Sequence, residues 1–274
     1  MSEPAVHVVE LPPLFKDLVL LDSSTHADWT YQPLNGVPWL SGENLVPLTF
    51  EEFEQAQRDY PVVFSLGDRP VPLALMGLTE GTNAFVDADG GLEGDVYLPA
   101  YARAYPCLIR SIDGHDLLGF DPTWPIIAPA GTGQPLVADG AFTPVAGEIY
   151  RQCELFAASF GRTQALVMEL LKHDLLIDGE ATVSRRGDDK AHTFNGFRII
   201  DQARFQALGA DVLADWNARG ILVPVAAHLM SLQRFGALLD RHLRKGDPGF
   251  VDARLPEPSF GKRARQKDRP AVPA

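Results

Sequence analysis

The sequence predicts an α+β fold, with helices packed on a mostly antiparallel sheet and a C-terminal half that is mainly helical. Residues 61–120 contain short β-rich runs separated by Gly, Pro and Asp turn signals. Residues 144–174 and 211–244 show apolar side chains at helical spacing. We expect the sheet to form from residues 61–120 and 180–200, and the two helical regions to pack on it.

The composition predicts a soluble globular protein, with 274 residues of which 46% are hydrophobic and 22% charged. A formal net charge of −12 argues against a general nucleic-acid binder, because phosphate contacts need clustered Lys and Arg. Cys107 and Cys153 fit no metal-ligand spacing, so we interpret them as buried thiols in a reducing compartment. The N-terminus has no secretory-signal pattern and no apolar run approaches about 18 residues. We therefore expect a cytoplasmic protein without a transmembrane segment.

Three regions are expected along the chain. Residues 1–45 are rich in Pro and turn residues and predict an N-terminal arm that packs over the body. Residues 46–245 predict a single α+β domain. Residues 246–274 end in "GKRARQKDRPAVPA", a basic stretch without apolar periodicity, which predicts a disordered tail. Contact of this tail with anionic partners is the alternative.

A helix is predicted from Thr49 to Tyr60. Thr49 followed by Glu52 has the spacing of a capping box. Pro61 disfavours helical dihedrals at the residue before it, so the helix ends there. The runs "VVFSL" and "VPLALMGL", on either side of "GDRP", predict a hairpin. The residues on one helical face are Phe50, Phe53, Ala56 and Tyr60.

The junction Arg-x-Tyr-Pro occurs twice, first at Arg58 and Tyr60 and again at Arg103 and Tyr105. In the second copy "LPAYARAY" predicts a short helix, and "PCLIRSI" and "LLGF" predict strands around the turn "DGHD". One interpretation is structural, with two similar packing units of one antiparallel sheet. The other is functional, with the four Arg and Tyr side chains as two edges of a groove that grips a peptide or a small anion.

The second copy is the stronger functional candidate. Its helix is short, and Tyr97, Tyr101 and Tyr105 have a spacing of four that would place them along one side. Each tyrosine has an apolar ring and a hydroxyl that needs a partner. We therefore predict that these tyrosines and Arg103 line a binding surface.

The C-terminal half should begin with a helix after the loop-rich stretch 121–141. Thr143 and Pro144 predict the N-cap and the first helical residue. Gly161 should divide the following apolar stripe into two helices. Residues 180–200 predict a hairpin with a polar tip at 184–190. The last two helices are "ADVLADWNARG" and "VPVAAHLMSLQRFGALLDRHLRKG".

The sequence contains no recognisable catalytic motif, and we predict no metal and no cofactor. The carboxylate-rich stretch "DADGGLEGD" (87–95) lacks the register of a calcium-binding EF-hand, so we interpret it as a turn, with calcium as the alternative. His228 lies among apolar residues, which favours a hydrogen-bonded core histidine and leaves a binding role as the alternative. An enzyme would need a site assembled from scattered residues such as His228, Asp201, Tyr60 and Tyr105.

Five blocks resemble successive blocks of the SapC family of bacterial proteins, in the same order. They are "VPLTFEEFEQAQRDYPVVF", "NAFVDADG", "YLPAYARAYPCLI", "NGFRIIDQARFQAL" and "AAHLMSLQRFGALL". The resemblance covers residues 46–243. It departs at Asn195, where Asn-Gly-Phe-Arg stands in place of the Asp-Gly-Leu-Tyr that is frequent in the family.

The resemblance implies a non-enzymatic accessory protein that binds a peptide, a protein segment or a small ligand. Family members are often encoded near TonB-dependent receptors and tryptophan-halogenase-like proteins, which implies an uptake or substrate-modification system. The family label also implies a surface-layer role, which fits poorly with a chain that has no N-terminal export signal. An enzyme is the remaining alternative.

Overall fold

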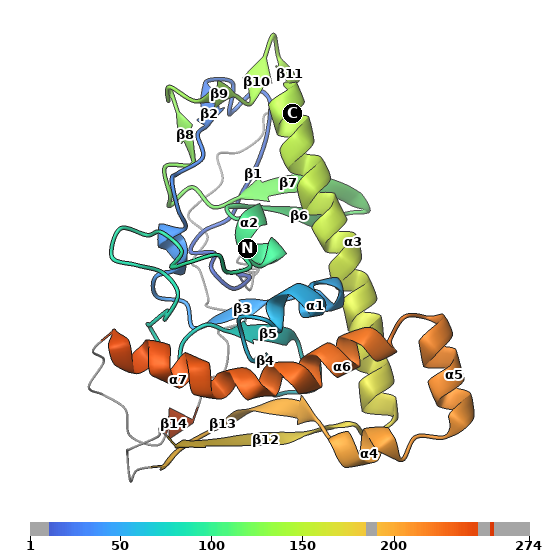
Figure 1. Cartoon of the computed structure of the whole chain (residues 1–274). Helices are drawn as coiled ribbons and strands as arrows, with labels where there is room; N and C mark the ends of the chain where they lie inside the picture. The colour runs from blue at the N-terminus through green and yellow to red at the C-terminus, as the bar shows by residue number, and fades with distance from the viewer. Residues whose placement is uncertain (1–10, 185–190, 246–252, 255–274) are drawn as a thin grey trace, which may run out of the picture.

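The computed structural model of the chain describes residues 11–184, 191–245 and 253–254. It confirms the α+β class: antiparallel sheets carry the helices, and the C-terminal part is rich in helix (Figure 1). A large sheet lies in one half of the molecule and several small sheets in the other half. The long helix α3 (Pro144–Lys172) runs along one side past both halves (Figure 1).

The described strands are mostly short. Their bounds are β1 Val19–Leu20, β2 Trp29–Tyr31, β3 Leu45–Pro47, β4 Val62–Phe64, β5 Pro72–Leu75, β6 Cys107–Ile112, β7 His115–Phe120, β8 Ile127–Pro129, β9 Gln134–Pro135, β10 Val137–Ala138, β11 Ala141–Phe142, β12 Leu176–Ser184, β13 Ala191–Ile200 and β14 Ala253–Arg254.

The helices concentrate after residue 143. Besides α3, their bounds are η1 Pro38–Leu40, η2 Phe50–Glu52, α1 Phe53–Ala56, α2 Ala100–Ala104, α4 Gln202–Gln206, α5 Ala210–Ala218, α6 Leu222–Ser231, η3 Leu232–Arg234 and α7 Phe235–Arg244, where η marks a 3-10 helix.

The large sheet has the strand order β12-β13-β4-β5-β3, and β14 pairs with β13 in parallel. The other neighbours are antiparallel. Every residue of β3, β4 and β5 is buried. Helix α6 contacts β4 and β13, and α7 contacts β12. Of the predicted tail, the structure describes only β14; the rest lies outside the described residues, as does most of the predicted hairpin tip, 185–190.

The two Arg-x-Tyr-Pro units have the predicted local order, helix then strand then turn then strand. The expectation that they share one sheet is wrong, because β6 and β7 form a separate sheet with β1 in the order β1-β7-β6. The physical reason is side-chain composition. Strands β4 and β5 are apolar throughout and need a central position. Strand β6 ends and strand β7 begins in exposed residues, which suits a sheet that is partly open to solvent.

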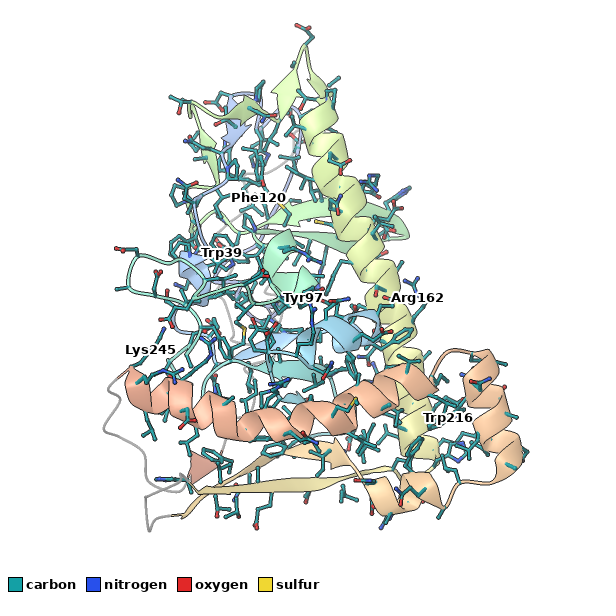
Figure 2. The ribbon with its side chains drawn as sticks, in the orientation of Figure 1. Trp39, Tyr97, Phe120, Arg162, Trp216 and Lys245 are labelled. Carbon is teal, nitrogen blue, oxygen red and sulfur yellow. The ribbon has the colours of Figure 1, made fainter. Side chains whose placement is uncertain are left out.

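Three clusters of buried side chains make up the core. The largest covers the big sheet, α1 and the C-terminal helices and includes Trp216. The second includes Phe120, Cys107 and Cys153, and a small third one joins Phe15 to Tyr105. Figure 2 shows Phe120 and Trp216 in different halves of the molecule. Helix α3 contributes side chains to the first two clusters, so it connects the two halves.

The prediction that Gly161 interrupts this helix is wrong, since α3 is continuous from Pro144 to Lys172. A glycine inside a helix costs only about 0.5–1 kcal/mol relative to alanine, and side chains on both sides of Gly161 are buried in the core. The predicted N-cap is confirmed: the Thr143 hydroxyl accepts a hydrogen bond from the Ala146 amide at 3.4 Å.

The helix expected over residues 49–60 is shorter than predicted and comprises η2 and α1. The predicted C-terminal helices correspond to α5 and to the run α6, η3 and α7. Within the described residues, that run, Leu222–Arg244, is the one helical stretch long and apolar enough to cross a membrane, and 44% of its most apolar window is buried. Buried core helices pass the same test, so this is weak evidence for a membrane segment.

Two glycines should respond in opposite directions to an added methyl group. A Cβ at Gly179 would lie 2.5 Å from the buried Phe197 ring, whereas nothing lies within 4 Å of one at Gly161. We expect Gly179→Ala to lower the free energy of unfolding by about 1–3 kcal/mol and Gly161→Ala to raise it by about 0.5–1 kcal/mol. Urea denaturation measures both. A stabilised Gly179→Ala variant would contradict the packing of β12 on β13.

Candidate functional site

The first Arg-x-Tyr-Pro unit has a structural tyrosine. The Tyr60 side chain is fully buried, and its ring packs edge-on against Phe85 with centroids 4.7 Å apart. Its hydroxyl donates to the carbonyl of Tyr97 at 2.7 Å. Burial raises the pKa of Tyr60 well above its usual value, so the hydroxyl stays neutral. Arg58 is exposed and donates to the Gln55 side chain at 2.8 Å.

The second unit also has a buried tyrosine. The Tyr105 hydroxyl donates to the Asp121 carboxylate at 3.0 Å, and both side chains are buried. Asp121 also accepts from the Lys16 amide at 2.7 Å and from the Thr123 amide at 2.8 Å. Burial and the nearby Asp121 raise the pKa of Tyr105. Asp121 therefore joins Tyr105 to the segment before β1.

The prediction that Tyr97, Tyr101 and Tyr105 lie along one side of a helix is wrong. Helix α2 begins at Ala100, so Tyr97 lies in the extended segment before it and Tyr105 is its C-cap. The three hydroxyls have different acceptors: the Glu52 carboxylate, the Pro13 carbonyl and the Asp121 carboxylate. Each of the three tyrosines lines a different surface pocket.

Glu52 connects the two units. Its side chain is buried, and one oxygen accepts from the Thr49 amide at 2.8 Å and the Thr49 hydroxyl at 2.9 Å. The other oxygen accepts from the Tyr97 hydroxyl at 2.9 Å and the Ala100 amide at 2.6 Å. The same carboxylate therefore supports the start of η2 and the start of α2, and it occupies all its acceptor positions.

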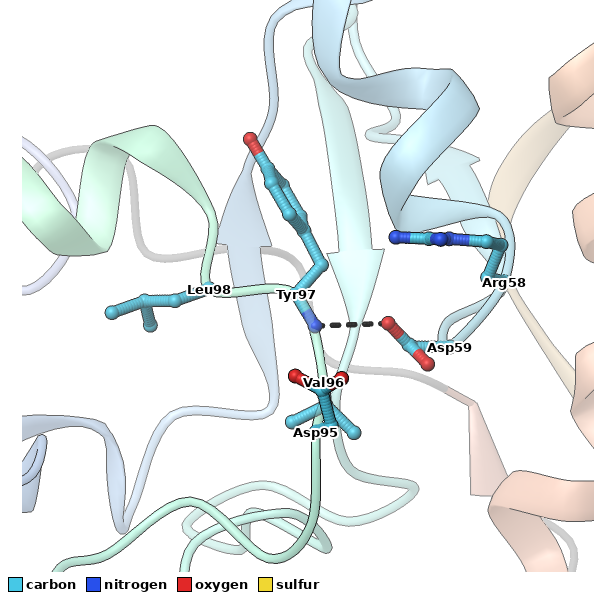
Figure 3. A pocket seen from close by; sticks show the side chains of 6 residues that line it. All are labelled: Arg58, Asp59, Asp95, Val96, Tyr97 and Leu98. Atoms are coloured by element: carbon cyan, nitrogen blue, oxygen red, sulfur yellow. Dashed lines mark hydrogen bonds between the residues drawn. The ribbon is translucent and has the colours of Figure 1, made fainter.

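A polar depression lies beside this connection and is lined by both units (Figure 3). Figure 3 shows the Tyr97 amide bound to the Asp59 carboxylate, at 2.9 Å, with the Arg58 guanidinium beyond it. Acidic and basic groups lie side by side here, and the depression is open to solvent. The residues that line it are Arg58, Asp59, Asp95, Val96, Tyr97 and Leu98.

A second pocket of about 420 Å³ lies between α2 and the first half of α3, and we call it the α2–α3 pocket. Arg103 and Tyr105 of the second unit line it, together with side chains from β2 and β9. Its volume falls within the range of small-ligand sites. The full lining is Tyr31, Arg103, Ala104, Tyr105, Pro106, Cys107, Gln134, Pro144, Val145, Glu148, Ile149, Gln152 and Cys153.

The α2–α3 pocket has charged groups of both signs at its rim. Arg103 is exposed and lies over the Tyr97 ring, 5.4 Å from its centroid, with a long hydrogen bond of 3.4 Å to the Tyr97 hydroxyl. No carboxylate of the described residues pairs with it. Glu148 is bound to Arg151 and Gln152, each at 2.7 Å, and these bonds lower its pKa to about 2.

Neutral sulfur atoms contribute to the lining of the same pocket. Cys107 and Cys153 are both buried and free. Burial raises the pKa of Cys153 to about 12, and burial with the neighbouring Cys153 raises that of Cys107. Both therefore remain thiols at neutral pH and behave as small apolar groups. The pocket combines a largely apolar lining with Arg103, a cation that has no carboxylate partner among the described residues.

The scattered residues considered for catalysis have separate hydrogen-bond partners. His228 is buried, and its Nε2 accepts from the Ile200 amide at 3.0 Å. Asp201 caps α4 by accepting from the Ala203 and Arg204 amides at 2.9 and 3.1 Å. The Tyr60 and Tyr105 hydroxyls have the separate partners given above. His228 therefore has the role of a hydrogen-bonded core histidine.

Two further observations concern ions. Among the described residues, no group of three His, Cys, Asp or Glu side chains is placed to hold a metal. In the carboxylate-rich stretch, the Asp87 side chain accepts from the Asp89 amide at 2.9 Å and the Gly91 amide at 2.7 Å. These bonds stabilise the turn that the sequence predicts.

Sequence reasoning missed the double role of Glu52 and the whole role of Asp121. The capping-box spacing identified Glu52 as a helix cap, but its bonds to Tyr97 and Ala100 join residues more than forty positions apart. Asp121 follows directly after an apolar strand, where an acidic residue is ordinarily a turn residue. Only its complete burial distinguishes it.

Residues 21–238 match the model of the SapC family, which is most of the chain. The protein belongs to the SapC family, and the resemblance predicted from the sequence blocks is confirmed. No curated protein and no solved structure matches the chain at a significant level.

Removing one acceptor of Glu52 should destabilise the protein. In Glu52→Gln, an amide NH₂ replaces an oxygen and faces donors at either position, so we expect the free energy of unfolding to fall by about 1–3 kcal/mol. Glu54→Gln is the matched control, because Glu54 is exposed in α1, the helix that directly follows η2. Denaturant titration measures both. Equal stabilities for the two variants would contradict the connecting role of Glu52.

The burial of His228 predicts a dependence of stability on pH. Desolvation lowers its pKa from 6.5 to about 3, so the folded state holds a neutral ring while the unfolded state binds a proton below about pH 6.5. The full free energy of unfolding associated with the neutral His228 ring is present above pH 6.5, and it declines as the pH falls below that value. Relative to His228→Gln, the wild type should lose about 2 kcal/mol between pH 7.5 and 5. A pH-independent difference in unfolding free energy would contradict this.

Proposed function

We propose that this SapC-family protein is a cytoplasmic, non-enzymatic accessory protein that binds a peptide or protein segment in the α2–α3 pocket. The observation that supports this is the exposed Arg103 guanidinium, without a carboxylate partner in the described structure, at the edge of an apolar pocket of about 420 Å³. A planar guanidinium recognises a carboxylate through two parallel hydrogen bonds.

The chemistry of the pocket favours a segment with an apolar side chain beside a carboxylate. Val145, Ile149 and the two thiols offer an apolar surface to the side chain. Arg103 would pair with the carboxylate, and the charged Glu148 lies among the other lining residues. An amide or ammonium group of the ligand could donate a hydrogen bond to the Glu148 carboxylate.

Binding is favoured over catalysis because the candidate acid and base groups are already occupied. Burial raises the pKa of Tyr60 and Tyr105, and Tyr97 has its pKa raised to about 12 by burial and by Glu52. The low pKa of His228 results from complete burial in the core. The resemblance to accessory proteins of uptake or substrate-modification systems agrees with a binding role.

The test is selection from a random peptide library with free carboxyl termini, followed by fluorescence polarisation of the enriched peptides. We expect enriched peptides to combine an apolar residue with a terminal or side-chain carboxylate. Arg103→Lys should weaken their binding roughly tenfold, because an ammonium cannot replace the paired guanidinium bonds. Failure to enrich any peptide would contradict the proposal.

The sequence repeat supplies matched controls. Arg58→Lys makes the same change in the first Arg-x-Tyr-Pro unit, outside this pocket, and should leave the affinity unchanged. Tyr105→Phe should lower the free energy of unfolding by about 0.5–1.5 kcal/mol without weakening binding, because its hydroxyl bonds to Asp121. If Arg58→Lys and Arg103→Lys weakened binding equally, the peptide would lie elsewhere.

A further inference from the structure

A separate pocket of about 360 Å³ is lined by Tyr101, and we call it the aromatic pocket. Three aromatic rings form a continuous row in it. The Tyr101 and Phe156 centroids lie 5.5 Å apart, and Phe156 stacks on Phe160 at 6.0 Å. The full lining is Leu11, Pro12, Pro13, Pro47, Arg69, Val71, Tyr101, Phe156, Phe160 and Gln164.

The segment Leu11–Pro13 forms part of the pocket lining. The Tyr101 hydroxyl donates to the Pro13 carbonyl, which attaches this segment to α2. Leu11 itself is buried and packs with Phe15 and Tyr105. The pocket is therefore built by five parts of the chain that the tertiary structure brings together, 11–13, Pro47, 69–71, Tyr101 and 156–164, and most of its lining is apolar.

Gln164 is one of two strongly polar exceptions within this apolar lining, and Arg69 is the other. The Gln164 amide nitrogen is buried and has no hydrogen-bond partner in the described structure. A buried amide donor without an acceptor costs about 1–3 kcal/mol, and native proteins leave few such groups. A ligand that places an oxygen in the pocket would supply the missing acceptor.

Arg69 adds a positive charge at the same pocket. It is exposed, it lies in the turn between β4 and β5, and no carboxylate of the described residues forms an ion pair with it. An amide donor and a guanidinium in the lining of one apolar pocket are complementary to a carboxylate attached to an apolar body. Neutral apolar molecules would leave both groups without a partner.

We infer that the aromatic pocket is a second binding site, which takes a small carboxylic acid with an aromatic or branched aliphatic body. The body packs against the row Tyr101, Phe156 and Phe160. The carboxylate accepts from the Gln164 amide and pairs with Arg69. This site shares no lining residue with the α2–α3 pocket, so its test is independent of the proposed function.

Isothermal titration calorimetry of the full chain with 3-phenylpropanoate tests the inference. Its amide, 3-phenylpropanamide, is the matched neutral probe and should bind at least tenfold more weakly. Gln164→Leu keeps the volume and removes the donor, and Arg69→Gln removes the charge. Each should weaken 3-phenylpropanoate roughly tenfold. Arg103→Lys, in the other pocket, should leave this affinity unchanged.

Three outcomes would overturn the inference. They are no binding of 3-phenylpropanoate at millimolar concentration, equal binding of the acid and its amide, or equal binding by wild type and both pocket variants. Thermal unfolding of each variant shows whether it remains folded. A fourth outcome concerns self-association, measured by sedimentation. If the chain self-associates and Gln164→Leu abolishes this, the pocket binds a second copy of the chain, which would also overturn the inference.

Discussion

The arrangement of this protein depends on one buried carboxylate. Glu52 accepts four hydrogen bonds, two at the start of η2 and two from the segment that leads into α2. Since the backbone of Tyr97 is also bound to Asp59 and Tyr60, the extended segment before α2 is attached to the first unit at several points. The position of α2, and hence of every pocket around it, follows from these bonds.

Helix α3 supplies the second constraint. It is the longest helix described, and it adds buried side chains to the cores of both halves. Helix α2 lies against it, so the space between the two helices is limited by side chains of both. The α2–α3 pocket and the aromatic pocket are the places where these side chains leave room. Each pocket contains a cation without a described carboxylate partner, Arg103 in one and Arg69 in the other.

The two copies of the Arg-x-Tyr-Pro junction share the structural role of the tyrosine but differ in what surrounds the arginine. In both copies the tyrosine is buried and follows a short helix, and its hydroxyl bonds to a distant part of the chain. The arginines differ, because Arg58 borders a polar depression and Arg103 borders an apolar pocket. The tyrosines therefore stabilise the fold, while the two arginines border surfaces of different polarity.

The sequence by itself determined the α+β class, the family, the capping residues Thr49 and Thr143 and the order of elements within each unit. These depend on spacings of a few residues, which propensity and periodicity describe. The tertiary structure alone decided that the two units enter different sheets and that α3 continues through Gly161. It also decided that Tyr97, Tyr101 and Tyr105 line three pockets. Those outcomes depend on which side chains from distant parts of the sequence pack into the same buried space. Local sequence patterns do not specify such long-range contacts.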